Sequence, residues 1–236
     1  MIISTLRVLL VLLVTVCFSI LALIAAPFDR RGSAFHALSR PWARTVLRIC
    51  RVKVHAEGLE NIVAGTTYVY VSNHASMFDI PAVMVGIHTD IRIVYKKELA
   101  YMPIWGWALA AGPFISIDRF SAKDAMKSLE KAAEKMKHGA SVLLFAEGTR
   151  TRTGKLQPFK RGAFTLAAKS GIPIVPLTIN NSFKIMPKGS LRIRPIDISI
   201  IVDKPISTVG ADTKSAELEL MESVRRSIEK LYIDQG

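Results

Sequence analysis

Residues 67–79 read TYVYVSNHASMFD, and this stretch divides into three parts. The β-branched and aromatic residues 67–71 are typical of a buried strand, and the apolar run 80–87 that follows is typical of a helix. The polar residues between the two lie in a turn that presents side chains at the mouth of a sheet. We therefore expect this strand–turn–helix unit to carry the functional site.

His74 and Asp79 are the candidate catalytic pair of this turn. A carboxylate that holds one ring nitrogen lets an imidazole act as a general base toward a hydroxyl group. On a regular helix, positions five residues apart lie roughly 140° from each other. The two side chains can therefore meet only if His74 precedes the helix and folds back toward Asp79.

The same residues permit a structural interpretation. Ser76 and Asp79 form an S-x-x-D pattern before an apolar run, and this pattern resembles a capping box in which Asp79 serves the first-turn amides. The two interpretations are compatible, because a carboxylate at the positive end of a helix tends to stay ionised. The pattern alone leaves both open.

From residue 51 onward, short apolar runs alternate with amphipathic stretches, which is typical of an α/β domain. Strands are predicted at 52–56, 68–71, 91–95, 114–117, 142–145 and 174–179, with a strand pair at 191–193 and 196–202; helices are predicted at 78–87, 97–110 (broken at Pro103), 122–137, 162–169 and 215–232. We therefore predict one mixed-sheet α/β domain over 51–236, flanked by helices and preceded by membrane-associated helices over 1–50.

The composition indicates anionic surroundings. The chain has 236 residues, half of them hydrophobic, and its 32 Lys and Arg against 19 Asp and Glu give a net charge of +13. Such a balance suits nucleic acid, anionic lipid headgroups or phosphorylated substrates. The apolar N-terminal region makes nucleic acid the weaker alternative, so we predict no nucleic-acid partner.

Residues 8–26 are almost uninterruptedly apolar, and with Ile2 and Ile3 they approach the ~20 residues that span a bilayer. A cleaved signal peptide is the alternative, but its apolar core usually has only ~7–15 residues. Residues 33–50 alternate apolar side chains with arginines, as an interfacial helix does. The two segments therefore form either a span with a linker or a hairpin in one leaflet, with the basic flank and the domain on the cytoplasmic side.

A second candidate site follows the predicted strand 142–145. Residues 146–154 read AEGTRTRTG, and glycine lets the backbone approach a phosphate that guanidinium groups bind bidentately. The alternative is a solvated basic loop. Arg119, after the short strand 114–117, could supply another phosphate contact or form a surface ion pair with Asp118. No Walker loop and no metal-ligand spacing occurs in the sequence, and its two cysteines, Cys17 and Cys50, suggest no disulfide, so we predict no metal site.

Taken together, four stretches resemble the blocks of the 1-acylglycerol-3-phosphate acyltransferases, a family of glycerolipid acyltransferases. The first resembles N-H-x4-D, the second G-x-x-F-I-x-R with one extra residue, the third F-P-E-G-T-R-S and the fourth a V-P-[LVI]-x-[IV] strand. The matching residues are Asn73, His74 and Asp79; Gly112, Phe114, Ile115 and Arg119; Phe145, Glu147, Gly148, Thr149 and Arg150; and 175–179. Ala146 and Thr151 depart from the usual proline and serine.

The resemblance implies transfer of a fatty acyl group from a thioester, acyl-CoA or acyl carrier protein, to the 2-hydroxyl of lysophosphatidic acid, with no other cofactor. His74 would be the general base, Asp79 would orient it, and Asn73 would support them. The acceptor phosphate would be held by Arg119 and Arg150, with the pocket shaped by Glu147, Gly148 and Thr149. No acyl-enzyme is required, because the attacking hydroxyl belongs to the substrate.

Three alternatives remain at this stage. Another acceptor, such as glycerol 3-phosphate, a lyso-ornithine lipid or a different lysophospholipid, would use the same base. A thioesterase would release thiol without any acceptor. A non-catalytic protein that binds anionic lipid would leave His74 and Asp79 without a function.

Overall fold

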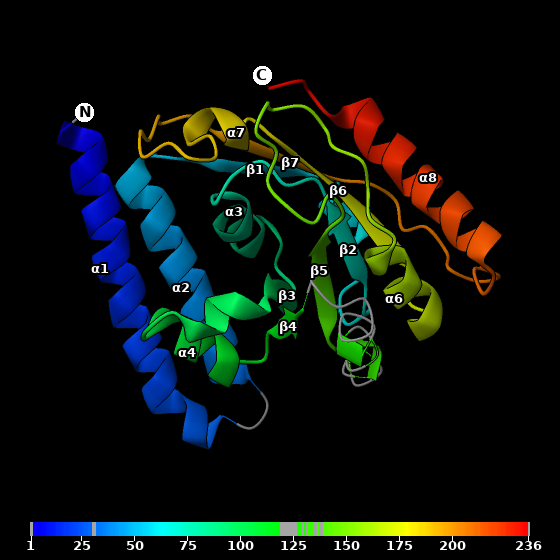
Figure 1. Cartoon of the computed structure of the whole chain (residues 1–236), viewed down its shortest axis with the longest axis horizontal. Coiled ribbons are helices and arrows are strands. Elements are labelled where there is room, and N and C mark those ends of the chain that lie inside the picture. The colour runs from blue at the N-terminus through cyan, green and yellow to red at the C-terminus, as the bar shows by residue number, and fades with distance from the viewer. Residues whose placement is uncertain are drawn as a thin grey trace.

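The computed structural model describes residues 2–29, 32–118, 127, 128, 130, 132–134, 136 and 139–235. Two long helices come first. They are α1 (Ile2–Ala25), followed by the short helix η1 (Ala26–Phe28), and α2 (Ser33–Cys50). Figure 1 shows that α1 and α2 lie side by side and antiparallel, at one end of the molecule.

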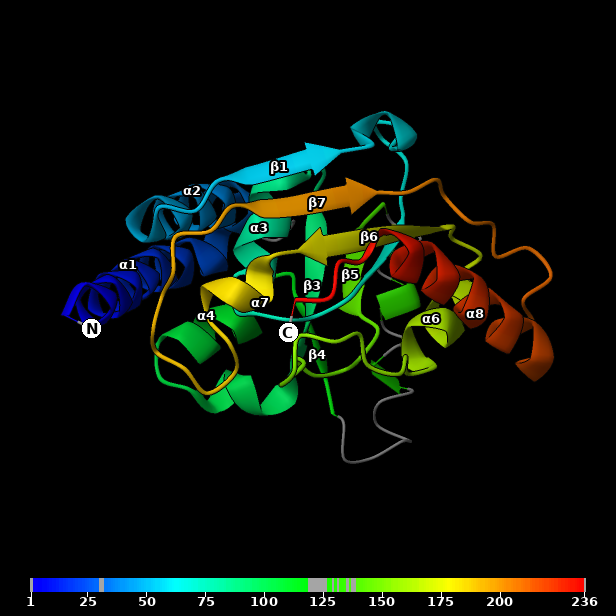
Figure 2. The ribbon, with the colours of Figure 1, turned by 90° about the horizontal axis from the view of Figure 1, so that it is seen from above.

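A seven-stranded mixed sheet forms the centre of the domain. Its strands are β1 (Val54–Glu57), β2 (Val69–Ser72), β3 (Ile91–Lys96), β4 (Ile115–Ile117), β5 (Ser141–Phe145), β6 (Ile174–Asn180) and β7 (Ile198–Val202). They lie in the order β1-β7-β6-β2-β5-β3-β4, and every neighbouring pair is parallel except β6 with β7. Figure 2 shows β6 running against its neighbour β7.

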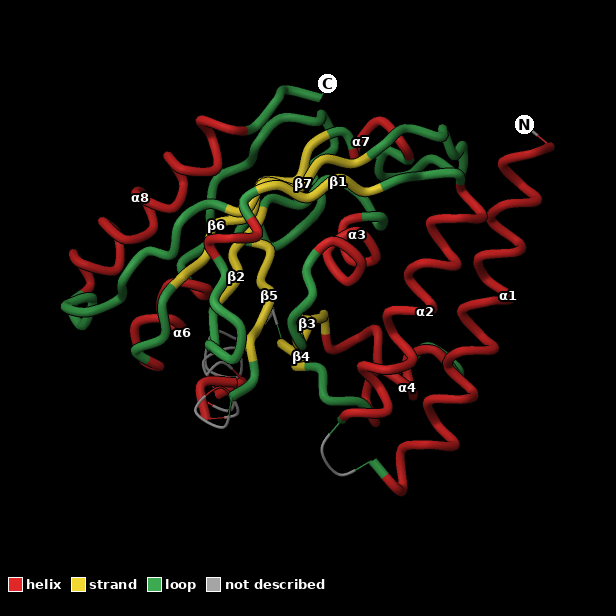
Figure 3. Tube along the Cα trace, turned by 180° about the vertical axis from the view of Figure 1, so that it is seen from behind, coloured by secondary structure: helices red, strands yellow, loops and turns green. Residues whose placement is uncertain are grey.

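Helices cover both faces of the sheet (Figures 1 and 3). The face toward α1 carries α2, α3 (Asp79–Gly86) and the pair η3 (Lys97–Tyr101) and α4 (Trp105–Ala111). The other face carries α6 (Gly162–Ser170) and α8 (Lys214–Leu231). Thr213 caps α8, because its hydroxyl accepts the N–H of Ala216. The short helices η2 (Leu59–Asn61) and α7 (Ser182–Ile185) lie in connections.

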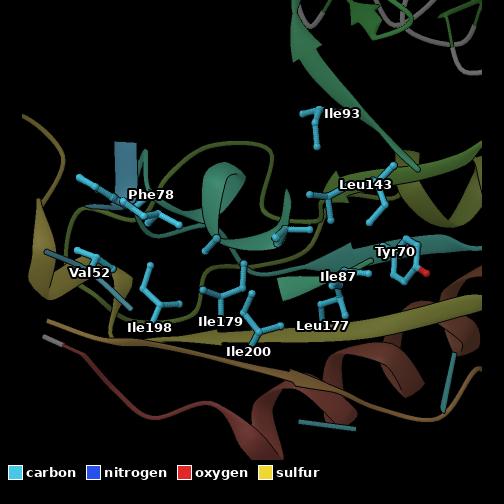
Figure 4. Packing of buried hydrophobic residues seen from close by; sticks show 14 of the residues in the cluster. Val52, Tyr70, Phe78, Ile87, Ile93, Leu143, Leu177, Ile179, Ile198 and Ile200 are labelled. Atoms are coloured by element: carbon cyan, nitrogen blue, oxygen red, sulfur yellow. The ribbon is translucent and has the colours of Figure 1, made fainter. Parts of the chain in front are cut away.

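Alternating side chains of the central strand β2 supply two cores, one on each face of the sheet. Tyr70 points to the α2 and α3 face, and Val69 and Val71 point to the α6 and α8 face. Figure 4 shows side chains of the first core, among them Tyr70 and Leu143, meeting between the sheet and the helices. Because both faces are covered, the strand ends are rigid supports for the loops that follow them.

The predicted fold class, a mixed sheet flanked by helices, is confirmed, and so is the break of helix 97–110 near Pro103. The predicted division at residue 50 stays a prediction: α2 ends at Cys50, and its side chain belongs to the core that α3 shares with the sheet. The predicted helix 122–137 lies largely outside the described residues.

One predicted strand is wrong. Residues 191–193 do not pair with β7, which lies instead between β1 and β6. The N–H and carbonyl of Ile193 both bond to the hydroxyl of Ser4 on α1, at 3.2 and 3.4 Å. The backbone N–H of Arg194 donates to Ile185 of α7, a helix that the sequence did not predict. These contacts commit the backbone groups that a strand would need.

Candidate active site

The candidate site lies where three neighbouring parallel strands end. β2 is flanked by β5 on one side and β6 on the other, so their carboxyl ends meet at one edge of the sheet. Open α/β sheets bind ligands at this edge. The two stretches that the sequence singled out, 73–79 and 146–154, are the loops that follow β2 and β5.

His74 and Asp79 are joined as predicted. The His74 Nδ1 atom lies 2.7 Å from the Asp79 Oδ2 atom, and the same oxygen accepts the N–H groups of Ala75 at 2.8 Å and Ser76 at 2.9 Å. The geometry works because α3 begins at Asp79, so His74 lies before the helix and the turn folds back. The Asp79 carboxylate is fully buried, and three donors hold one of its oxygens.

This arrangement defines the His74 imidazole. Because Nδ1 lies against a carboxylate, it carries the ring proton, and Nε2 is the nitrogen that accepts one. The ring stacks on Phe145 with centroids 3.9 Å apart and planes inclined by 14°. Its side chain is 17% exposed, whereas the Asp79 side chain is fully buried.

Only one half of the capping box is formed. The residue before α3, Phe78, provides no side-chain cap, and the Ser76 hydroxyl donates instead to the carbonyl of Met186, at 3.2 Å. The other half is present, because the Asp79 carboxylate accepts the backbone N–H of Ser76, together with that of Ala75. Its carboxylate therefore stabilises both the turn that carries His74 and the entry to the helix.

Asn73 links the first loop to strand β6. Its amide donates to the carbonyl of Ile179 at 2.9 Å, and its side-chain oxygen accepts the N–H of Ile179 at 2.8 Å. This reciprocal pair continues the β2–β6 ladder one residue beyond the last strand residue, Ser72. Asn73, the residue before His74, therefore joins the start of the loop to β6, and its supporting role in the reaction stays a prediction.

Glu147 joins the two loops. It is 3% exposed, and its carboxylate accepts the backbone N–H of His74 at 2.6 Å and two N–H groups of Gln157, at 3.0 and 2.9 Å. Burial raises the pKa of the Glu147 carboxyl, while the N–H donors of His74 and Gln157 oppose that shift. The backbone N–H of Thr151 also donates to the His74 carbonyl, at 2.9 Å.

The predicted phosphate residues lie beside this junction. Gly148 has a φ of 71°, and a Cβ there would lie 2.8 Å from Cδ of Lys160, so a side chain would strain the turn. Thr149 is exposed, and its hydroxyl lies 3.0 Å from the Lys188 ammonium. Arg150 is half-buried. Arg119 falls outside the described residues, and the phosphate-binding roles of these four residues and of Glu147 stay predictions.

Several residues that support the site by hydrogen bonds were not predicted from the sequence. Gln157 and Lys188 contact the second loop, and the Tyr232 hydroxyl donates to the carbonyl of Gly154. Burial, together with the Glu147 carboxylate, raises the pKa of Tyr232, so its hydroxyl remains a donor. Gln235 donates to the Ile179 carbonyl at 3.2 Å. No motif or spacing connects these residues with the two loops.

A separate cavity of about 230 Å³ lies between α2, α3 and the start of β3. Its lining includes His36, Arg40, Thr89 and Asp90, and none of the residues described above. The chemistry at the carboxyl edge therefore does not depend on it.

Comparisons with known proteins agree with this geometry. Residues 53–180 match the family model described as Acyltransferase. The chain is 32% identical to the 1-acyl-sn-glycerol-3-phosphate acyltransferase of Pseudomonas aeruginosa, over 84% of this chain and 78% of that protein. It is 38% identical to the chloroplastic 1-acyl-sn-glycerol-3-phosphate acyltransferase BAT2 of Brassica napus, over 78% of this chain and 54% of that protein.

The solved structure of PlsC, the 1-acyl-sn-glycerophosphate acyltransferase of Thermotoga maritima, has the same fold. It superposes with a TM-score of 0.79 at 23% identity, over 98% of this chain and 95% of that one. The chain spans about half the length of the first plant relatives, 54% and 56%. On the family model and the Pseudomonas relative, the chain belongs to the 1-acyl-sn-glycerol-3-phosphate acyltransferase family.

Proposed function

We propose that this protein transfers a fatty acyl group from a thioester to the 2-hydroxyl of 1-acylglycerol 3-phosphate, giving phosphatidic acid. The observation that carries the proposal is the 2.7 Å contact between His74 Nδ1 and Asp79 Oδ2, beside a basic loop in a member of this family. The names of the relatives support the acceptor, and the thioester donor, acyl-CoA or acyl carrier protein, is part of the proposal.

The reaction needs one base and no enzyme nucleophile. Nε2 of His74 takes the proton from the 2-hydroxyl while the oxygen attacks the thioester carbonyl. The tetrahedral intermediate collapses, the carbon–sulfur bond breaks, and the imidazolium returns the proton to the leaving thiolate. The products are an ester and a thiol. The Asp79 carboxylate stabilises the imidazolium that forms in between.

Arg150, Arg119 and the backbone around Gly148 and Thr149 would hold the acceptor phosphate. In the acceptor, one carbon and one oxygen separate the carbon that bears the 2-hydroxyl from the phosphorus. Thr151 donates to the His74 carbonyl and Glu147 accepts from the His74 N–H, so the loop after β5 is bonded directly to the residue that carries the base. This coupling supports productive placement of the hydroxyl against Nε2.

An acceptor panel tests the proposal. Membranes with the wild type or His74→Ala are given one acyl thioester and, in turn, lysophosphatidic acid, glycerol 3-phosphate, a lyso-ornithine lipid and another lysophospholipid. We expect thiol release with lysophosphatidic acid only when both substrates are present, and a kcat about 10²–10⁴-fold lower in His74→Ala. Release without any acceptor would indicate a thioesterase, and near-normal transfer by His74→Ala would refute the mechanism.

We also propose that α1 anchors the domain to one leaflet of the membrane. α1 is apolar enough to span a bilayer, and most of its large apolar side chains are exposed. Its Ser4 bonds to Ile193 of the domain, and its Thr15 accepts the indole N–H of Trp42 on α2. A spanning α1 would draw these contacts and the arginines of α2 into hydrocarbon, at a cost of several kcal/mol.

Labelling at the two ends of α1 distinguishes the two arrangements. Ile2→Cys and Phe28→Cys are made separately in a background without Cys17 and Cys50, and an impermeant thiol reagent is added to vesicles whose cytoplasmic face points outward. Anchoring in the cytoplasmic leaflet predicts that both variants react. Reaction at only one end would show that α1 crosses the membrane.

A further inference from the structure

We propose that Lys188 is a further binding residue of the acceptor phosphate, acting beside Arg150. Lys188 lies in the segment between α7 and β7, outside all four sequence blocks. The proposal rests on the proposed function, since it names a residue of the same site. It follows from three observations: the contacts of the ammonium group, the charges around it, and the way its segment is fixed.

The ammonium contacts the loop that is predicted to hold phosphate. Nζ of Lys188 lies 3.0 Å from the hydroxyl oxygen of Thr149 and 3.4 Å from the carbonyl oxygen of Arg150. A lysine ammonium has three N–H donors. The two contacts leave one donor and the full positive charge for an anion that enters between Lys188 and the loop.

The charges around the loop differ in their partners. Arg161, which follows the same loop, is paired with Glu217 at 2.5 Å. Among the residues that the structure describes, no carboxylate forms an ion pair with Lys188 or Arg150. The nearby Glu147 carboxylate is occupied by N–H donors of His74 and Gln157. Within the described part of the chain, the Lys188 ammonium at Thr149 is therefore not neutralised by a direct carboxylate contact and can bind a phosphate.

The segment that carries Lys188 is fixed to the catalytic loop. The hydroxyl of Ser76, in the turn between His74 and Asp79, donates to the Met186 carbonyl at 3.2 Å. Two residues later, Lys188 reaches Thr149. The segment thus contacts the loops after both β2 and β5. A phosphate held by Lys188 would keep a defined distance from the imidazole, which is the condition for placing the 2-hydroxyl at Nε2.

Steady-state kinetics with acyl-CoA test the assignment. Lys188→Ala, Lys188→Arg and the control Lys184→Ala are compared with the wild type in membranes, and KM is measured for lysophosphatidic acid and for acyl-CoA. Lys184 carries the same charge four residues earlier, on α7. Losing one charge-assisted hydrogen bond predicts a KM for lysophosphatidic acid about 10-fold higher in Lys188→Ala, with kcat and the KM for acyl-CoA nearly unchanged.

Two further readouts separate binding from a structural effect. Inorganic phosphate, which lacks the acyl chain, should compete with lysophosphatidic acid about 10-fold more weakly in Lys188→Ala, and Lys188→Arg should restore both values to within a few-fold. An unchanged acceptor KM, a loss confined to kcat, or a rise in the acyl-CoA KM instead would overturn the assignment. A wild type that does not acylate lysophosphatidic acid would refute the proposed function itself.

Discussion

The two loops at the carboxyl edge of the sheet differ in their outer residues: both have buried polar side chains bonded to the protein, Glu147 among them, but only the loop after β5 also has exposed ones. In the loop after β2, buried polar side chains are committed to protein partners: Asn73 to β6 and Asp79 to His74 and two backbone N–H groups. In the loop after β5, Thr149 and Arg152 are exposed and Arg150 is half-buried. The first loop has a fixed geometry, as a chemical step requires, and the second presents positive charge to a ligand. Substitutions should therefore lower kcat in the first loop and raise KM in the second.

Asp79→Asn should give the largest effect and tests the first half of this comparison. One oxygen of the Asp79 carboxylate accepts three donors. The asparagine amide has a single acceptor oxygen and no charge to stabilise the imidazolium. We expect kcat to fall about 10²–10⁴-fold, with the KM for lysophosphatidic acid nearly unchanged. The melting temperature in detergent is the control for folding. A kcat within a few-fold of the wild type would show that Asp79 only shapes the turn.

Arg150→Ala tests the second half. It removes a charged donor group from the ligand-facing loop, so binding shared by the ground state and the transition state is lost. The KM for lysophosphatidic acid should rise about 10–100-fold, while kcat changes little. Arg152→Ala, two residues on and exposed, is the matched control and should leave KM within a few-fold. A large fall in kcat with constant KM would place Arg150 with the catalytic group.

The catalytic loop could be predicted from the sequence because its contacts are local. His74 and Asp79 are five residues apart in one turn, so a strand, a turn and a helix are enough to bring them together. The parallel strands follow from the alternation of strands and helices, but the order that places β2 beside β5 does not. The Asp79 half of the capping box is formed, but the Ser76 hydroxyl bonds instead to Met186, 110 residues away. Local patterns do not encode such a partner.

The supports of the second loop could not be predicted for the same reason. Lys188 and Tyr232 contact it from 39 and 78 residues farther along the chain, and both contacts depend on how distant elements pack. Residues 191–193 also depend on a distant contact. Their composition is strand-like, but Ile193 bonds to Ser4 of α1 instead of pairing with a strand. Tertiary contacts decide the state of such short segments.

Glu147→Gln should have an intermediate effect, because Glu147 lies in the loop after β5 and its side chain bonds to His74 in the loop after β2. The amide of glutamine would place N–H groups against the N–H donors of His74 or Gln157, so the variant should lose about 1–3 kcal/mol of unfolding free energy. At about 2–4 °C per kcal/mol for a chain of this size, the melting temperature in detergent measures the loss.

The pH dependence of this variant provides a second test. The folded protein binds the Glu147 proton more tightly than the unfolded chain does, because burial raises the pKa above its ordinary 4.5. The wild type should therefore lose unfolding free energy as the pH rises from 4.5 through the raised pKa, and Glu147→Gln should lack that part of the slope. Equal slopes in the two proteins would show that the carboxyl group does not titrate in that range.

Tyr232→Phe should have the smallest effect and asks how firmly the second loop is held. Removing the hydroxyl leaves the buried Gly154 carbonyl without this donor, at a cost of about 0.5–1.5 kcal/mol, and should raise the KM for lysophosphatidic acid only a few-fold. Tyr101→Phe, on an exposed tyrosine of η3, is the control and should change neither value.

The same variant should show no pH dependence of its own near neutrality. Burial raises the pKa of the Tyr232 phenol above its ordinary 10.0, so the hydroxyl is protonated in both the folded and the unfolded chain at lower pH. Its contribution to stability is then constant and is lost only as the pH rises from 10.0 through the raised pKa. The difference in melting temperature between wild type and Tyr232→Phe should accordingly be the same at pH 6 and pH 9. A difference that shrinks toward pH 9 would mean that the phenol titrates there and that the second loop is more open to water than the first.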